Sequence, residues 1–506
     1  MTDAVSVAEY GLPGVKKWLA LSATMLGLGV YMLTMTLSGA ALPRMQGTFS
    51  AAPDQMAWLL TSFVIGTTIM TACSGWIAVR FGRTRFYCIA TAGFTLASVL
   101  CGLSTSLEEA ILFRTLQGVF GAPLLPLGQA IAADSFPPRK QGMAVALWSM
   151  GGVCGTIFGP YFGGMLIEEH GWPWVFFVNV PLGVLAFLAT AAFVPETKRD
   201  ETRHFSWPGF ALAATGIAAF QLALNRGQRL DWFDSPEIVI EAAVGVFAIY
   251  LFGLHLTHSR RPFFDPTIFR DRNYVFGLAM VFIHGAIIYL QMFLMPILLQ
   301  DLAGYGIQDV GRILAWRAVG IFSGMLVVSQ VSDRIDPRIV FGGGFLCVIS
   351  SAWSMSLWTM DVRAFDAGLW ILMNGMGSAV TYVPISLMGF STLPKERRNE
   401  GMALFYLAQT LGTATGTALI FNVLTRSMRV NHDSMSELLS PYNEMFQHGI
   451  ASKVWSLAHR GGLAAVDAEI SRQASMIAYN NSFYFIALTA LLLVPLTAFM
   501  RLPSRK

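Results

Sequence analysis

The stretch GVFGAPLLP, residues 118–126, recurs later in the chain as GMGSAVTYVP, residues 375–384. The two stretches lie about 257 residues apart and keep the same order of glycine and proline inside long apolar runs. The loops that follow them, SFPPRKQGMA at 135–144 and TLPKERRNEGMA at 392–403, also correspond. This repeat predicts two related halves, an architecture typical of membrane transporters with a substrate site between the halves.

The composition around this repeat is that of a membrane protein. Hydrophobic residues make up 54% of the 506 residues and charged residues 13%, about half of the ~25% usual in soluble proteins. Too few charges are present to cover the several soluble domains that a chain of this length would form. The net charge of +4 is small, which argues against nucleic-acid binding. All five cysteines lie in apolar runs, which indicates buried thiols and not a disulfide framework.

Fourteen stretches are long enough to cross a bilayer, since a spanning helix needs about 20 mainly apolar residues. The predicted spans are 18–42, 57–79, 86–103, 109–133, 142–166, 174–194, 207–225, 237–257, 274–298, 309–331, 339–358, 367–390, 401–424 and 482–500. Most Lys and Arg residues fall in connecting segments on the side of the two termini. The positive-inside rule therefore predicts a multi-pass, all-α membrane protein with both termini in the cytoplasm.

The repeat and the spans divide the chain into four parts. We expect a cytoplasmic tail at 1–17, a six-helix bundle at 18–198, an inserted two-helix segment at 199–260 and a second six-helix bundle at 261–506. The second bundle contains a long polar segment at 425–479, which we expect to be a periplasmic loop. That loop is either a solvated cap or a docking surface for another protein, because such length is unusual for a compact loop.

Glycine spacing marks one face of the fifth predicted span. Gly151, Gly155, Gly159 and Gly163 recur every four residues, and Pro160 follows Gly159. A helix face without side chains lets another helix approach closely. We expect these residues to form the bundle contact, and the glycine face is either structural packing of helices or a sliding hinge between the bundle halves.

The segment GWIAVRFGRTR at 75–85 lies between the second and third spans. Gly75 and Gly82 predict a tight cytoplasmic turn, and Arg80 and Arg83 flank it. The arginines either anchor the topology or act as a gate, by binding helix C-termini of the other half in one access state.

Polar side chains inside predicted spans are candidates for the substrate and proton pathway, because an ionisable residue there costs about 2.5–3.5 kcal/mol to insert. Arg114 and Gln117 lie in the fourth span, and Arg114 either lines a cavity or snorkels to the interface. Arg317 lies about 12 Å into the tenth span, at ~1.5 Å per residue. We expect it to line the second half together with His284 and Asn374, although a buried histidine can also be purely structural.

Charged residues at span ends have simpler interpretations. Arg312 is three residues from Asp309, which predicts a structural pair. No carboxylate lies in the middle of a clear span, since Glu241 is near one end of the inserted pair and Asp134 is at a cytoplasmic end.

Five motifs together resemble one family, the fourteen-span drug:proton antiporter-2 group of the major facilitator superfamily, whose members are multidrug efflux permeases. The resemblance covers nearly the whole chain and is specific for the family, but not for a substrate. The motifs are GWIAVRFGRTR (75–85), RTLQG (114–118), GTIFGPYFGG (155–164), GWPWVFFVNVPLG (171–183) and NRGQRLDWFDS (225–235).

This resemblance implies a major facilitator fold with two six-helix bundles plus two inserted helices. It also implies an inner-membrane exporter that moves small hydrophobic or amphipathic compounds by alternating access in exchange for protons. A periplasmic adaptor protein and an outer-membrane channel are its implied partners, and no cofactor is implied. An enzyme is not expected, because the sequence contains no metal-ligand spacing and no nucleophile–base motif.

One departure from the family pattern bears on proton coupling. In LTMTLSGAALP, residues 33–43, Thr34 stands where the family pattern has an aspartate that is a usual candidate for proton transfer. Two alternatives therefore stay open: a transporter of a specific anionic metabolite, indicated by Arg317, and a transport-inactive scaffold or sensor, indicated by the missing aspartate.

Overall fold

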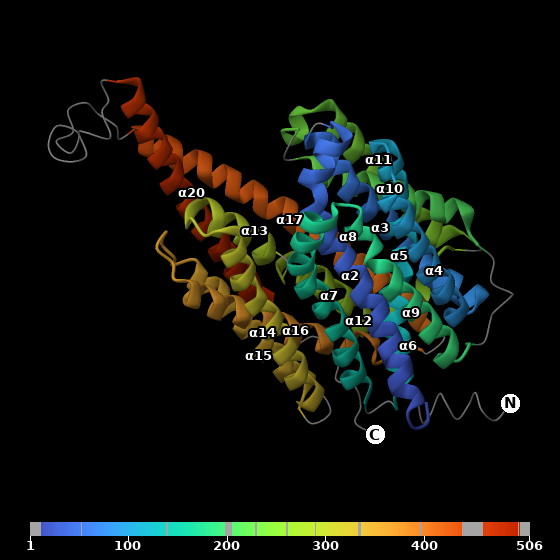
Figure 1. Cartoon of the computed structure of the whole chain (residues 1–506). Helices are drawn as coiled ribbons and strands as arrows, with labels where there is room; N and C mark the ends of the chain where they lie inside the picture. Colours follow the sequence, from blue (N-terminus) through green and yellow to red (C-terminus); the bar gives the residue numbers. More distant parts are fainter. Residues whose placement is uncertain are drawn as a thin grey trace.

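The computed structural model describes residues 12–493 and residue 495, apart from short gaps. The gaps are residues 52, 138–139, 198–204, 228–229, 260–261, 289, 332–334, 395–396, 438–458 and 494. Every regular element in the described part is a helix, as Figure 1 shows, and the predicted all-α class is confirmed. The predicted boundaries at 198/199 and 260/261 lie outside the described residues.

The N lobe is the first bundle of helices. Pro123 and Pro126 break its fourth pass into two helices and a short 3₁₀ turn, because proline lacks an amide hydrogen and clashes with the preceding turn. The N-lobe elements are α2 (Lys16–Phe49), α3 (Pro53–Phe81), α4 (Arg83–Gly102), α5 (Leu107–Gly121), η1 (Ala122–Leu124), α6 (Pro126–Asp134), α7 (Gln141–His170), α8 (Trp174–Phe177) and α9 (Asn179–Phe193).

The C lobe repeats this arrangement. Helix α2 packs on α7 as α12 packs on α17, and α3 packs on α5 as α14 packs on α16. The internal repeat seen in the sequence is therefore a repeat of packing. The C-lobe elements are α12 (Arg272–Ile288), α13 (Leu290–Ile297), the π-helix η5 (Leu298–Leu302), α14 (Ile307–Val331), α15 (Pro337–Met355), α16 (Ala364–Phe390), α17 (Arg398–Glu437) and α20 (Arg460–Leu493).

The inserted pair consists of α10 (Trp207–Gly227) and α11 (Pro236–His258), which pack on each other. Helix α10 also contacts α3 of the N lobe and α17 of the C lobe. Helix α11 exposes large apolar side chains, among them Ile240 and Phe247 at 62% and Val246 at 70%. Apolar exposure of this extent is unusual in a soluble protein and fits a lipid-facing helix.

Each of the fourteen predicted spans is helical over most of its described residues. Twelve of these passes are long and apolar enough to cross a membrane, and α7 and α20 are the two that are not among them. The twelve confirm a multi-pass membrane protein, and the number fourteen stays a prediction.

The segment 425–479 is helical over most of its described length, so the expectation of a long loop was wrong there. Helix α17 continues to Glu437, and α20 begins at Arg460. Helix α17 has 40 residues and is about 60 Å long at ~1.5 Å per residue, twice the ~30 Å of a hydrocarbon core. The two helices pack on each other, and α17 is longer than a single bilayer crossing requires.

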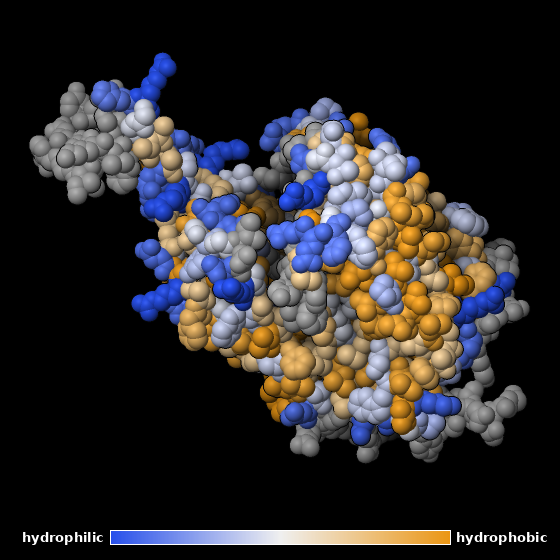
Figure 2. Space-filling view, in the orientation of Figure 1, coloured by the Kyte–Doolittle hydropathy of each residue, from blue (hydrophilic) through white to orange (hydrophobic). Residues whose placement is uncertain are grey.

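The two lobes meet mainly through two helix pairs, α7 with α14 and α3 with α17, and also through smaller contacts of α6 with α17 and of α7 with α16. We call the end of the molecule where α2 begins and α6 ends the basal end, and the opposite end, where α17 finishes, the open end. Figure 2 shows a notch between the lobes at the open end. Toward the basal end, N-lobe residues join the C-lobe core instead; they are Ala72, Cys73, Ala130, Ala146 and Met150.

Candidate functional site

The N lobe holds a buried arginine at its centre. Arg114 on α5 is 1% exposed and donates from Nε to the carbonyl oxygen of Leu59 (3.2 Å) and from Nη1 to Oε1 of Gln117 (2.6 Å). Its guanidinium carbon lies 4.4 Å from the ring centroid of Phe63, within cation–π range. The side chain therefore does not snorkel, and the structure brings the two predicted residues together.

Gln117 links this arginine to α4. Its Nε2 donates to Oγ of Ser98 at 2.7 Å, and Gln117 itself is fully buried. Nη2 of Arg114 is buried and finds no hydrogen-bond partner among the described residues. One donor of a permanent cation is thus available inside the lobe, at a place where an anion or a polar substrate group would be favoured.

The C lobe holds a second buried arginine, Arg317, and the two other predicted residues lie on the helices packed beside it. Arg317 on α14 is 8% exposed; its Nε donates to Oδ1 of Asn374 and its Nη2 to the carbonyl oxygen of Ile288, both at 3.3 Å. His284 on α12 is 3% exposed, and its Nε2 lies 3.1 Å from Oγ1 of Thr381. All three predicted side chains therefore join α12, α14 and α16 inside the lobe.

Arg312 behaves differently from Arg317. Its Nη1 lies 3.2 Å from Oδ1 of Asp309, and both side chains are more than half exposed. The predicted pair is confirmed, and it lies outside the buried cluster.

Thr34 lies within α2 (Lys16–Phe49). It is fully buried, and its hydroxyl donates to the carbonyl oxygen of Val30 at 2.8 Å, one turn earlier on α2. Thr34 therefore satisfies its hydrogen bond within its own helix, as buried threonines commonly do.

The glycine face of α7 contacts α2 and not the other lobe, which corrects the predicted bundle contact. A Cβ on Gly151 would meet the carbonyl oxygen of Met25, one on Gly155 that of Gly29, and one on Gly159 the side chain of Thr36. Helix α7 meets the C lobe through a different face. Gly163 is buried, and the side chain of Pro160 lies outside the described part.

One of the gate-loop predictions needs correction as well, since Gly75 is not part of the turn, whereas Arg80 and Arg83 flank it as predicted. Gly75 and Arg80 lie within α3, so the turn between α3 and α4 consists of Gly82 alone. Gly82 has a φ of +95°, a conformation that favours glycine. Arg83 bonds within its own lobe, from Nη1 to Oδ2 of Asp134 at the end of α6, at 2.7 Å.

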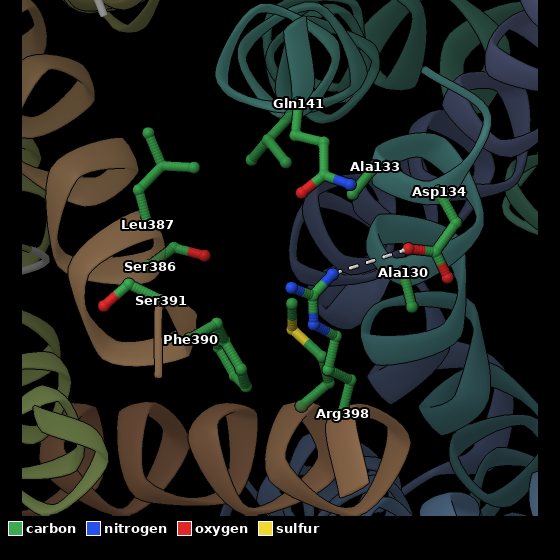
Figure 3. Close-up of a pocket in the computed structure, with 11 residues that line it drawn as sticks. Ala130, Ala133, Asp134, Gln141, Ser386, Leu387, Phe390, Ser391 and Arg398 are labelled. Atoms are coloured by element: carbon green, nitrogen blue, oxygen red, sulfur yellow. Dashed lines mark ion pairs between the residues drawn. The ribbon is translucent and has the colours of Figure 1, made fainter. Parts of the chain in front are cut away.

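Asp134 also faces the C lobe across a small cavity. Its Oδ1 lies 3.9 Å from Nη1 of Arg398 on α17, as Figure 3 shows. The cavity measures about 90 Å³, room for about three water molecules at ~30 Å³ each, whereas drug-sized ligands need about 300–1,000 Å³. The lining residues are Ala130, Ala133, Asp134, Gln141 and Val145 of the N lobe and Ser386, Leu387, Phe390, Ser391, Arg398 and Met402 of the C lobe.

Next to this cavity lies a group of neutral polar residues that sequence reasoning missed. Gln129 of α6 donates from Nε2 to Oγ of Ser386 at 3.0 Å. Its Oε1 accepts from the hydroxyls of Tyr382 at 3.0 Å and Tyr406 at 2.6 Å. Gln129 and Ser386 are 257 positions apart, which is the offset of the internal repeat. This offset is the sequence feature that could have identified the two residues as a pair.

One buried and one partly buried carboxylate lie away from the span centres. Glu400, near the start of α17, is 3% exposed. Glu241 on α11 lies 2.6 Å from Nη1 of Arg226 on α10, in a pair that ties the two inserted helices together. Neither carboxylate lies in the Arg114 or the Arg317 cluster.

Comparison with known proteins gives consistent matches over nearly the whole chain. The sequence profile of the Major Facilitator Superfamily matches residues 24–417. The multidrug export protein EmrB of Escherichia coli (strain K12) is 31% identical over 492 residues, 94% of each chain. The probable multidrug resistance protein EmrY of the same strain is 29% identical over 505 residues, 97% of each chain.

Among solved structures, the proton:xylose symporter XylE bound to 6-bromo-6-deoxy-D-glucose matches with a TM-score of 0.60. The match covers 95% of this chain and 96% of that chain at 15% identity. At this identity the likeness shows the fold alone.

Proposed function

Because the chain belongs to the Major Facilitator Superfamily, a family of transporters, we propose that it exports small hydrophobic and amphipathic compounds across the bacterial inner membrane. The observation that carries this proposal is the pair of buried arginine clusters in two lobes that are closed at the basal end. The multidrug export named for EmrB, 31% identical over 94% of each chain, supports the direction and the substrate class.

The mechanism we propose is alternating access driven by protons, with the termini and the basal end in the cytoplasm. Arg114 with Gln117 and Arg317 with Asn374 are the proposed substrate and proton pathway, with one buried cluster in each lobe. His284 is the proposed site of proton handling, since it is buried beside this C-lobe cluster and Thr34 carries no titratable proton.

The partners we propose are a periplasmic adaptor protein and an outer-membrane channel. The extension formed by α17 and α20 supports an external contact, because its helices are joined by polar bonds and not by an apolar core alone. Asn481 donates to Oγ of Ser427 at 2.9 Å, and Nε2 of His432 lies 3.0 Å from Oδ1 of Asp467. Replacing the segment between Ser427 and Asn481 by a short linker should preserve insertion of the protein into the membrane. The shortened protein should no longer capture the adaptor protein.

The function is tested by transport in everted membrane vesicles. Vesicles containing the chain should accumulate a lipophilic drug when a proton gradient is imposed, and an uncoupler should abolish the accumulation. Arg114→Ala should lose uptake at equal membrane abundance, and Arg312→Ala is the matched control, since it removes an exposed arginine. Uptake of organic anions but not of neutral or cationic drugs would favour the anionic-metabolite alternative, and no uptake of any compound would favour the scaffold.

A further inference from the structure

One face of α7 changes from buried to exposed between two successive turns. Ala146, Met150 and Cys154 are spaced four residues apart and so lie on one face of the helix. Ala146 and Met150 are buried in the core shared with the C lobe, whereas Cys154 is exposed. The space between the lobes therefore closes at about the level of Met150.

Helix α17 shows the same change. Residues 401–407 are all buried, whereas most of the residues that follow, from 408 to 415, are partly exposed. Tyr406 lies at this boundary and bonds to Gln129 of the other lobe. The polar group of Gln129, Tyr382, Ser386 and Tyr406 is thus located where the passage between the lobes ends.

We propose that these four residues are the inner gate of the transport passage, with Gln129 as its central member. The inference rests on the proposed alternating access and names the side chains that hold its basal end shut. All four are at least nine-tenths buried, at 0%, 8%, 3% and 6% exposure in chain order. The three hydrogen bonds of Gln129 all cross from the N lobe to the C lobe.

The repeat explains why this place suits a gate. Gln129 and Ser386 occupy equivalent positions of the two halves, and they touch each other. Equivalent positions meet only near the axis that relates the halves, so any rocking of one lobe against the other must part them. A long amide on one side and a short hydroxyl on the other allow a direct bond where two identical side chains would compete for the same space.

Opening the gate breaks the three hydrogen bonds that Gln129 makes to Tyr382, Ser386 and Tyr406. Water or a polar group of a compound from the basal side can then take their place, because both can donate and accept hydrogen bonds. A substrate with a polar group can therefore hold the gate open by taking the place of the broken bonds.

The gate is tested by the accessibility of single cysteines, which needs no substrate. One reporter is native Cys154 with the other four cysteines replaced, labelled from the open side. The other is Val145→Cys in a cysteine-free background, labelled from the basal side of everted vesicles with a membrane-impermeant maleimide. Val145 lines the basal cavity and is 3% exposed, so it should react slowly while the gate is shut.

Gln129→Leu removes three hydrogen bonds, each of which stabilises the shut form by roughly two- to thirteenfold. The basal reporter should therefore react at least about tenfold faster, and Cys154 should react more slowly. Gln221→Leu is the matched control, because Gln221 is a fully buried glutamine on α10 that is not part of the gate. Its labelling rates should equal those of the wild type.

A second variant covers the case in which Gln129→Leu does not fold. Tyr406→Phe keeps the ring and removes only the hydroxyl that bonds to Gln129, so labelling at the basal reporter should rise between roughly two- and tenfold. Unchanged labelling in both variants, or equal changes with Gln221→Leu, overturns the gate. Normal gating in a chain that moves no drug would instead count against the proposed function.

Discussion

Replacing Gly155 by leucine is expected to destabilise the N lobe itself. A Cβ at this position would meet the carbonyl oxygen of Gly29 and come within 2.8 Å of the amide nitrogen of Leu33, both backbone atoms of α2. Backbone cannot rotate away as a side chain can, so α2 and α7 must separate. Gly151 lies against α2 on the same face, and the separation would therefore loosen the contact along its length.

The expected size follows from overpacking, which costs about 1–3 kcal/mol. A domain of this size changes its melting temperature by about 2–4 °C per kcal/mol, so Gly155→Leu should melt roughly 2–12 °C lower than the wild type. Gly342→Leu on α15 is the matched control, because nothing lies within 4 Å of a Cβ there. That change should be neutral or slightly stabilising, since leucine favours helix over glycine by about 0.5–1 kcal/mol.

The assay is thermal unfolding of the purified protein in detergent, followed by tryptophan fluorescence, with Gly155→Ala as an intermediate step. Transport is measured in parallel at equal membrane abundance. Suppose that Gly155→Leu has the same melting temperature as the Gly342→Leu control and yet loses transport. The glycine face would then act at the contact between the lobes, and the packing argument would be refuted.

Three further predictions concern single side chains. Arg317→Ala should lower drug resistance more than Arg312→Ala, whose exposed pair is worth at most about 1 kcal/mol; equal losses in a susceptibility assay would return Arg317 to a structural role. Thr34→Ala should change efflux little, whereas Thr34→Asp should make efflux depend more steeply on external pH. If efflux by Thr34→Ala is as low as that of the wild type treated with an uncoupler, Thr34 is in the proton-coupling path. Arg398→Gln should speed labelling of the basal reporter less than fivefold, since its 3.9 Å pair with Asp134 is partly exposed; a tenfold effect that survives high salt would contradict this.

The fold could be predicted from the sequence because membrane insertion leaves long apolar spans and duplication leaves a repeat at a fixed offset. The glycines of the two halves show this at one contact. A Cβ on Gly155 would meet the α2 backbone, and one on Gly412, 257 positions later, would meet the carbonyl oxygen of Phe282 on α12. The same spacing of small residues thus serves the same helix contact twice. What the spacing could not indicate was the partner helix, since a bare helix face fits any close neighbour.

The extension beyond the membrane could not be predicted from polarity. Residues 425–437 are polar, and polarity was interpreted as a loop, although a helix can continue in water when a second helix packs beside it. The bond from Asn481 to Ser427 and the contact of His432 with Asp467 join α17 to α20 in this region. These pairs lie 54 and 35 positions apart, too far for a local pattern to indicate them.

Charge determines which site residues a sequence can disclose. Arg114 and Arg317 stand out in apolar spans because a buried cation is expensive, and the structure places each with the amide predicted beside it. Thr34 was singled out only by comparison with a family pattern, and its hydroxyl is used within α2. A single position in a pattern does not indicate which way a side chain points, because that depends on how the whole helix is rotated against its neighbours.

The proposed gate could not be predicted from the sequence because its residues carry no charge, and the same property suits it to repeated opening. The four gate residues are neutral, so they do not stand out from the apolar residues of a predicted span as a charged residue would. They are Gln129, Tyr382, Ser386 and Tyr406. A buried ion pair in this place would have to lose its hydration at every closure, which costs several kcal/mol per ion. The attraction between the two charges does not always offset this cost. Neutral hydrogen bonds exchange with water at a net difference of only about 0.5–1.5 kcal/mol each. Three of them therefore give a closure firm enough to hold and weak enough to be broken in each transport cycle.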